Sequence, residues 1–298
     1  MIRYSRGLRP RPPASYMPTT GMELSRKRDQ LLSLLSSYGS CAVAFSGGVD
    51  SAVVAKAAQL ALGEAAVLVT GTSAAMAEGE LEAARALAEF IGLRHVVIAT
   101  EEFANPSYVA NAPDRCFHCK NELYTQIGGL SERLNVRVLV NGANADDLGD
   151  FRPGMRAASE HDVSSPLAEC GITKQEVREL AAAWKLPVAD KPATPCLSSR
   201  VAYGQEVTPE RLAMIDRAER LLRSLGFHEL RVRYHAGDMA RIEVPLEELN
   251  ELCQPEIRTR IVTELQSAGF KFVTLDLAGF RSGNLNQLIS PAELRRFS

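Results

Sequence analysis

The chain has 298 residues, of which 46% are hydrophobic and 23% charged, and its formal net charge at pH 7 is −2. This composition is typical of a globular protein, and the length allows one large or two medium domains. Six cysteines are too few for a disulfide scaffold, and no apolar run reaches the roughly 18 residues of a membrane span. The charge balance argues against a protein that binds nucleic acid through many phosphate contacts.

Residues 1–21 form an arginine-rich start without an acidic residue. They lack the apolar core of a secretory signal, and Pro10, Pro12 and Pro13 disfavour the amphipathic helix of a transit peptide. We expect a flexible extension, or a start codon placed too early with Met22 as the true first residue. We also expect a cytoplasmic protein.

Over residues 22–190, short apolar runs alternate with segments of helical periodicity. The runs 41–45, 65–70, 94–99 and 136–142 are typical of buried strands, and the segments 51–62, 77–92, 120–135 and 173–186 are typical of helices. Thr173 and Glu176 have the spacing of a capping box. This alternation predicts an α/β domain with a parallel sheet that is covered by helices on both faces.

The segment 190–204 is rich in Pro, Ser and Gly, which predicts a loop. After it, helices are expected at 208–226 and 254–268, and strands at 229–235, 240–244 and 270–277. We therefore place a domain boundary near residue 190 and expect a smaller α/β domain over residues 191–298.

A glycine-containing loop joins the first strand to the following helix, with the sequence Ser46-Gly47-Gly48-Val49-Asp50-Ser51. Glycines let the backbone approach an anion, and the amides at a helix start attract it. Asp50 would repel phosphate unless a divalent cation or the loop amides compensate its charge. The alternative is a tight strand-to-helix turn without a ligand.

A second polar segment, which includes Asn144, Asp146 and Asp147, follows the strand at 136–142. The carboxyl ends of parallel strands face the ligand crevice of such a sheet. Carboxylates at this place can hold the Mg²⁺ that neutralises a leaving pyrophosphate. The alternative is a turn with solvated acids.

The loop SGGVDS matches the PP-loop of the N-type ATP pyrophosphatases, an adenine nucleotide alpha hydrolase-like fold. Two later segments are more specific, KPATPCLSSRVAYG (191–204) and the block RVRYH…ARIEV (231–244), and a further segment, GFRSGNLNQLI (279–289), follows them. Together they resemble the LarE family from about Met22 to Ile289. The chain departs from that family's usual pattern at Ala143, Ser198 and Asn284.

The resemblance implies an enzyme of nickel-pincer cofactor synthesis. Its substrate would be pyridinium-3,5-biscarboxylic acid mononucleotide, one carboxylate of which is adenylated by ATP·Mg²⁺ before sulfur displaces AMP. The ATP-binding residues would be Ser46 to Ser51 with Asn144 and Asp147, and Asp146 and Asp147 would hold Mg²⁺. The resemblance also implies a homo-oligomer, with a hexamer as one option, that uses sulfide or another sulfur donor. From the charge balance and the lack of a long apolar run, we expect no binding to nucleic acid or membrane.

Arg231 and Arg233 are two residues apart on an expected strand, so their side chains share a face that suits a phosphate. The resemblance assigns them to the substrate phosphate and assigns Glu243 to activity. Arg200 would steady either the adenylate phosphate or the loop that contains Cys196. A solvated charged strand face is the alternative for the two arginines.

The source of the sulfur depends on three cysteines: the C-x-x-C pair Cys116 and Cys119, and Cys196. In one branch of the LarE family, the cysteine that matches Cys196 gives up its own sulfur and becomes dehydroalanine. In the other branch, all three cysteines hold a 4Fe–4S cluster with one iron left open, as soft thiolate ligands can. We expect the cluster, because all three are present. A zinc site that includes His118, or a redox pair, is the alternative.

Three other functions compete with this assignment. A PP-loop tRNA thiolase also combines these motifs with three cysteines, but it needs a basic RNA groove. An amidating ATP pyrophosphatase such as NAD synthetase explains SGGVDS alone. A non-catalytic nucleotide-binding protein leaves the acids and cysteines without a role.

Overall fold

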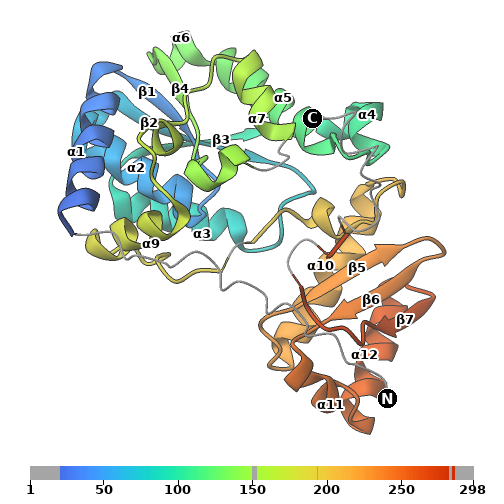
Figure 1. The fold of residues 1–298 in the computed structure, drawn as a ribbon. Helices are drawn as coiled ribbons and strands as arrows, with labels where there is room; N and C mark the ends of the chain where they lie inside the picture. Colours follow the sequence, from blue (N-terminus) through green and yellow to red (C-terminus); the bar gives the residue numbers. More distant parts are fainter. Residues whose placement is uncertain (1–20, 150–152, 193, 282–283, 286–298) are drawn as a thin grey trace, which may run out of the picture.

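The computed structural model describes residues 21–149, 153–192, 194–281 and 284–285 (Figure 1). Residues 1–20 of the expected extension lie outside the described residues, as do Gly283 and all positions from 286 onward. Gly21 begins the first helix, α1 (Gly21–Ser37). None of the helices in the described ranges is long and apolar enough to cross a membrane.

The larger part of the chain is built on a four-stranded parallel sheet. Its strands lie in the order β3-β2-β1-β4, and they are β1 (Cys41–Ala44), β2 (Ala66–Thr72), β3 (Arg94–Ala99) and β4 (Val138–Val140). The parallel sheet expected from the alternating pattern is thus confirmed. A parallel bridge from Val140 to Ser164 extends the sheet beyond β4.

Helices cover both faces of this sheet, as the fold class requires. Successive side chains of a strand point to opposite faces: Cys41 and Val43 pack with one group of helices, and Ala42 and Ala44 with the other. The first group comprises α1, α2 (Val49–Leu62), α3 (Glu80–Ile91) and α9 (Lys174–Ala183). The second comprises α5 (Arg115–Gly128), α6 (Ser131–Leu134) and α7 (Pro153–Glu160).

One helix differs from its expected bounds in a way that affects the site. The pattern predicts a helix over 120–135, but α5 begins at Arg115, ends at Gly128 and is followed by the separate α6. Cys116 and Cys119 therefore lie in the first turns of a helix. The capping box at the start of α9 is present as predicted, with Thr173 and Glu176 bonding reciprocally.

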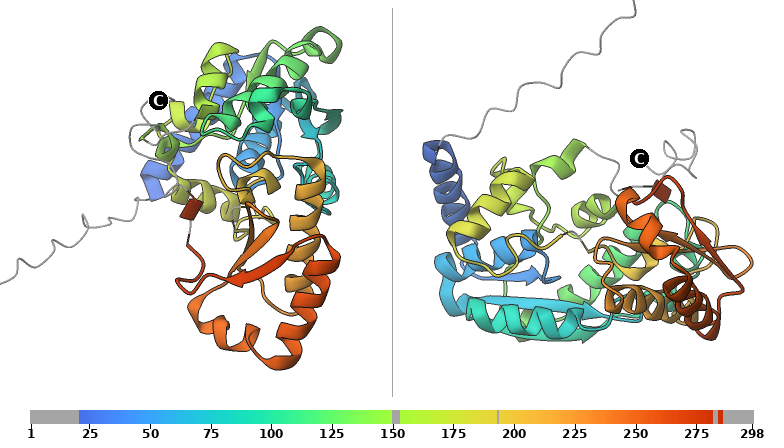
Figure 2. Two further views of the ribbon diagram at one scale, coloured as in Figure 1. Left: turned by 90° about the vertical axis from the view of Figure 1, so that its right-hand side faces the viewer. Right: turned by 90° about the horizontal axis from the view of Figure 1, so that it is seen from below.

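A second, three-stranded sheet lies apart from the first, as the views in Figures 1 and 2 agree. Its order is β5-β6-β7, with β5 and β6 antiparallel and β6 and β7 parallel. Helices pack against it through a common apolar core. These elements are α10 (Pro209–Ser224), β5 (Arg231–His235), β6 (Met239–Glu243), α11 (Leu249–Leu252), α12 (Pro255–Ser267) and β7 (Phe272–Leu275).

The two sheets lie on either side of residue 190, yet the second core is not built from the C-terminal part alone. Ala75, which follows β2, and Tyr108, in the short helix α4 (Pro106–Val109), are buried in it with Leu197 and Val201. The loops that follow β2 and β3 thus reach the 194–201 segment. This arrangement brings the carboxyl ends of the first sheet next to Cys196.

Candidate active site

The phosphate loop runs from the end of β1 to the start of α2. Gly47 has a φ of 73°, and a Cβ there would lie 3.2 Å from the Cβ of Ala84 in α3, so the position requires glycine. The Ser51 hydroxyl donates to the Gly48 carbonyl oxygen at 3.0 Å and lies 3.2 Å from the Ser46 hydroxyl. Two hydroxyls and the amides of a helix start therefore converge on one spot, which suits an anion.

Asp50 is paired with a lysine that sequence reasoning did not single out. The Lys174 Nζ lies 2.5 Å from Oδ2 of Asp50, and the Asn144 side-chain amide donates to Oδ1 at 3.1 Å. Lys174 is the first residue of α9, and its place after the capping threonine was the only signal in the sequence. A lysine ammonium thus compensates the carboxylate charge that was expected to need a divalent cation or loop amides.

The polar segment after β4 packs directly against the phosphate loop. A Cβ at Gly142 would lie 2.8 Å from the backbone nitrogen of Ser51. The Asp147 carboxylate accepts a hydrogen bond from the backbone nitrogen of Asn144 at 3.0 Å. The Asp146 carboxylate accepts one from the backbone nitrogen of Lys174 at 2.8 Å. This segment therefore lies against the phosphate loop, with the aspartates bonded to the turn and to the start of α9.

A cavity of about 220 Å³ joins the phosphate loop to the cysteines. Ser46 lies at its wall, together with Cys119 and Lys120 from α5, and Cys196. Most of its remaining lining is apolar and comes from the carboxyl ends of β1 and β2, which is the usual character of a small-molecule site. Among the lining residues are Ala44, Phe45, Val69, Ala75, Met76, Ala77 and Leu123.

The three cysteines lie in one neighbourhood. Cys116 and Cys196 are exposed, whereas Cys119 is half-buried. Burial raises the pKa of the Cys119 thiol to about 12, and the nearby charges of Cys196 and Cys116 act in the same direction. His118, the further ligand considered for a zinc site, contacts its own helix start instead, since its Nε2 lies 3.3 Å from a carboxylate oxygen of Asp114.

Within the part of the chain that the structure describes, no group of three or more His, Cys, Asp or Glu side chains is arranged to hold a metal ion. The iron–sulfur cluster on the cysteines and the Mg²⁺ on Asp146 and Asp147 therefore remain predictions.

Arg200 holds the backbone around Cys196 from the protein interior. Its guanidinium forms a buried ion pair with Glu219 of α10, with 2.9 Å between Nε and Oε1. It also donates to the carbonyl oxygens of Pro195 and Cys196, the latter at 3.1 Å. Of the two roles considered for Arg200, these contacts favour the one at the cysteine loop.

The same loop is held from its other side by residues that sequence reasoning missed. Arg115 donates to the Ser198 carbonyl oxygen and to the Asn111 side chain, both at 2.6 Å. The Tyr108 hydroxyl lies 2.7 Å from the Ser198 hydroxyl. The only signal in the sequence was an arginine directly before the C-x-x-C pair. The segment directly after Cys196 is thus tied to the α4–α5 region.

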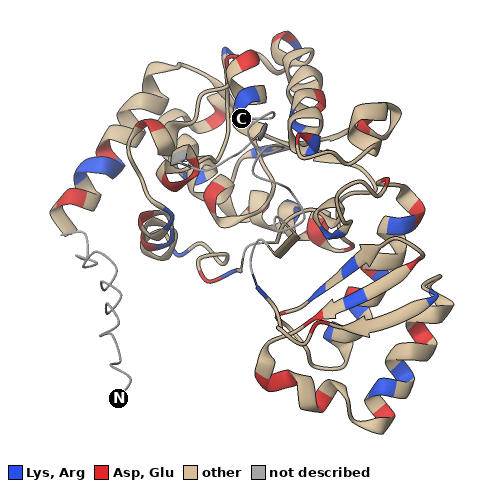
Figure 3. Cartoon of the chain, turned by 45° about the vertical axis from the view of Figure 1, so that its right-hand side comes forward, with Lys and Arg blue, Asp and Glu red and all other residues tan. Residues whose placement is uncertain are grey.

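Arg231 and Arg233 line a second cavity of about 190 Å³, together with Arg115 and Ser199. This agrees with the prediction that the two side chains share a face, and Figure 3 shows basic residues on β5 and β6. Burial is the main reason that the pKa of Arg231 is lowered to about 10, and the positive charge of Arg200 acts in the same direction. Its guanidinium also lies over the ring of Phe280, 5.2 Å from the centroid.

Glu243 is fully buried and accepts hydrogen bonds from neighbouring arginines. Its Oε2 accepts from Arg233 Nε at 3.0 Å, and its Oε1 accepts from Arg241 at 3.0 Å and from the Asn284 amide at 2.7 Å. Arg233 also donates to the Ser199 carbonyl oxygen at 3.1 Å. Two of the predicted residues, Arg233 and Glu243, are therefore joined in one buried network.

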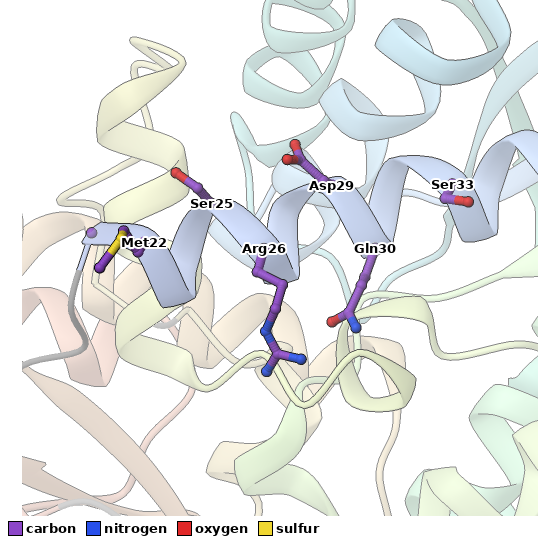
Figure 4. A pocket seen from close by; sticks show the side chains of 7 residues that line it. Met22, Ser25, Arg26, Asp29, Gln30 and Ser33 are labelled. Carbon is purple, nitrogen blue, oxygen red and sulfur yellow. The ribbon is translucent and has the colours of Figure 1, made fainter.

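A wider hollow of about 600 Å³ runs along α1 (Figure 4). Its lining residues all belong to that helix, among them Arg26, Asp29 and Gln30. It contains none of the predicted site residues, so we assign the site to the two cavities beside Cys196.

Comparison with known proteins agrees with this geometry. The asparagine synthase family model matches residues 29–191, which include the phosphate loop. The pyridinium-3,5-bisthiocarboxylic acid mononucleotide synthase of Lactiplantibacillus plantarum is 35% identical over 277 residues, which cover 92% of this chain and 99% of that protein. The chain belongs to the LarE family. This membership confirms the predicted class of enzyme, an ATP-dependent sulfurtransferase of the PP-loop superfamily.

Two other relatives show how far the LarE similarity extends. An uncharacterized protein of Synechocystis sp. is 43% identical over 90% of this chain and 99% of its own length. A glutamine-hydrolyzing GMP synthase component of Archaeoglobus fulgidus is 29% identical over 62% of this chain and 64% of its own length. The amidating enzymes thus match less of the chain than the LarE-type synthase does.

Proposed function

We propose that this LarE-family protein converts a carboxylate of pyridinium-3,5-biscarboxylic acid mononucleotide into a thiocarboxylate during nickel-pincer cofactor synthesis. A carboxylate oxygen attacks the α-phosphorus of ATP, and pyrophosphate leaves. A sulfur nucleophile then adds to the acyl carbon, and AMP leaves with the electrons of the broken C–O bond. Adenylation is needed because a free carboxylate has no good leaving group. The name of the Lactiplantibacillus relative supports the choice of substrate.

The observation that carries this proposal is the shared cavity of Ser46, Cys119 and Cys196. A nucleotide with its phosphates on the loop would have its α-phosphate on the same side of the sheet as two thiols. An amidating enzyme has no use for thiols at this place. Reactants held in one cavity gain the rate advantage of proximity.

ATP would be held by the loop residues Ser46 to Ser51, with Asn144 and Asp147 beside them. The helix start and the two serine hydroxyls suit phosphate oxygens, and Lys174 prevents Asp50 from repelling them. We assign Mg²⁺ to Asp146 and Asp147 on the chemistry of their oxygen ligands. Bound there, the ion supplies charge neutralisation for the leaving pyrophosphate.

The sulfur would come through Cys116, Cys119 and Cys196. The donor set suits a 4Fe–4S cluster, since three thiols from α5 and the 194–201 segment lie in one neighbourhood. Bound there, the cluster supplies an iron that is open to sulfide. In the alternative, Cys196 itself gives up sulfur, and the exposure of its thiol is compatible with either. Arg200 acts in both cases as a positioning residue for the Cys196 backbone.

The second cavity would take the phosphate of the mononucleotide. Arg231 and Arg233 supply donors at its wall, and Glu243 fixes the orientation of Arg233. It shares Pro195 with the ATP cavity, so a mononucleotide there would lie next to Cys196. We further propose a homo-oligomer and a cytoplasmic location, where a reducing environment keeps the three thiols free of disulfides.

Two measurements test this function. Release of AMP and pyrophosphate from ATP should depend on the mononucleotide, and Cys196→Ser should still form the adenylate but transfer no sulfur. AMP release that requires tRNA instead would establish the thiolase.

For the sulfur source, protein purified without oxygen should contain about four iron per chain with matching labile sulfide, and Cys116→Ser should lose both. Absence of iron, with loss of H₂S from Cys196 after turnover, would establish the sacrificial route.

A further inference from the structure

Glu102 is a buried carboxylate that none of the steps above uses. It begins the short helical turn Glu102–Ala104 after β3 and is only 3% exposed. Its Oε1 accepts a hydrogen bond from the Ser73 hydroxyl at 2.5 Å. Its Oε2 is buried and has no hydrogen-bond partner among the described residues. Leaving a buried polar atom without a partner costs about 1–3 kcal/mol, and more for a charged group, so such an atom calls for an explanation.

The position of Glu102 indicates what satisfies this oxygen. Glu102 and Ser73 both line the cavity that contains Ser46, so a molecule bound there would lie against the Glu102 side chain. Lys120 lines the same cavity, but no ion pair joins it to Glu102 in the described part of the chain.

We propose that Glu102 accepts a hydrogen bond from the nucleoside part of ATP and thereby contributes to nucleotide selection. This inference rests on the proposed binding of ATP in this cavity. A carboxylate repels the triphosphate, so only a neutral donor of ATP can approach Oε2. The neutral donors of ATP are the two ribose hydroxyls and the 6-amino group of adenine. Glu102 therefore reads one of these groups, while the phosphates occupy the loop at Ser46.

Glu102→Gln tests this hydrogen bond with little change in shape. The amide oxygen still accepts from Ser73, while an NH₂ group, which cannot accept, replaces Oε2. Binding would be measured calorimetrically with ATP, 2′-deoxy-ATP, 3′-deoxy-ATP and purine riboside triphosphate, which lacks the 6-amino group. Wild-type protein should bind one of the three analogues about tenfold or more weakly than ATP, because a hydrogen bond to a charged group is lost. The analogue affected identifies the donor.

The variant should bind ATP about tenfold more weakly than wild type and should no longer distinguish ATP from that analogue. Glu101→Gln is the matched control, since Glu101 is exposed on the neighbouring position, and it should keep the wild-type affinity ratios. Glu102→Asp shortens the side chain and withdraws the carboxylate, so it should reduce the affinity difference between ATP and that analogue. It replaces Glu102→Gln in the test if that variant does not fold. Unchanged ratios for all three analogues in a folded Glu102 variant would overturn the inference alone. Failure of wild-type protein to bind ATP would overturn the proposed function as well.

Discussion

Arg200 donates a hydrogen bond to the carbonyl oxygen of Cys196 at 3.1 Å, although its side chain is buried and paired with Glu219. Glu219, Arg200 and Cys196 thus form a chain of contacts from helix α10 to the loop of the proposed sulfur-bearing cysteine. The second sheet, through the helix that packs on it, determines where this loop lies. We therefore expect sulfur transfer to depend on the structural integrity of the C-terminal part.

Loss of Glu219 should destabilise the protein strongly. Glu219→Gln leaves the Arg200 guanidinium buried without its counter-charge, and breaking such a pair costs about 3–5 kcal/mol. The free energy of unfolding in urea measures this loss. Glu264→Gln is the control, because it removes an exposed pair with Arg217 and should cost less than about 1 kcal/mol. Equal losses in both variants would contradict the structural role of the buried pair.

The pH dependence of stability should reflect the ionisation of the Glu219 carboxylate. Burial alone would raise the pKa of Glu219, but Arg200 and Arg223 outweigh it and lower that pKa. The stabilisation is then complete above the unfolded-state pKa of about 4.3 and is lost as the pH falls through the lower folded-state pKa. The stability difference between wild type and Glu219→Gln should stay constant from pH 7 to about 5. A difference that grows as the pH falls through that range would indicate a raised pKa instead.

Gly142 should tolerate no side chain. A Cβ there would lie 2.8 Å from the Ser51 backbone nitrogen, so Gly142→Ala must displace either the start of α2 or the segment after β4. We expect a loss of about 1–3 kcal/mol in stability together with weaker ATP binding. Gly128→Ala places a Cβ in open space near the end of α5, and it should be neutral or slightly stabilising. Similar melting temperatures for the two variants would refute this packing.

Lys174 should be needed for nucleotide affinity because it offsets the charge of Asp50. Lys174→Met leaves that carboxylate beside the phosphate loop, and about 1 kcal/mol of added repulsion corresponds to several-fold weaker ATP binding. Lys174→Arg keeps the charge and should retain most of the affinity. Calorimetric titration at low salt checks both variants, since screening weakens the effect. Methionine and arginine variants with equal affinity would disprove charge compensation.

Alkylation should distinguish Cys119 from Cys196 in metal-free protein. The thiolate is the reactive form, and the pKa of Cys119 is raised to about 12, chiefly by burial. Cys119 should therefore react slowly with iodoacetamide at pH 8, whereas the exposed Cys196 should react readily. Peptide mass spectrometry measures the two rates. Cys41 is fully buried with a pKa near 12 and is the unreactive reference. Faster labelling of Cys119 than of Cys196 would contradict this environment.

Sequence patterns predicted the features that depend on local periodicity. They did not predict contacts between residues that are far apart in the chain. The strand 94–99 and the capping box at Thr173 were predicted correctly, because apolar runs and caps are local signals. The start of α5 was placed too late, since Arg-Cys-Phe-His-Cys carries no apolar period. Lys174 was missed as a partner of Asp50 because the two are 124 positions apart. Glu102 was missed because a single acid after a strand carries no signal until its burial is known.

The most direct test of sulfur transfer is the mass of the mononucleotide after reaction. The protein would be incubated without oxygen with ATP, Mg²⁺, sulfide and pyridinium-3,5-biscarboxylic acid mononucleotide. We predict a product in which sulfur replaces a carboxylate oxygen, with AMP formed in equal amount to the sulfur transferred. A mononucleotide of unchanged mass in the presence of bound ATP, or one that gains an amide in place of sulfur, would contradict the proposed function.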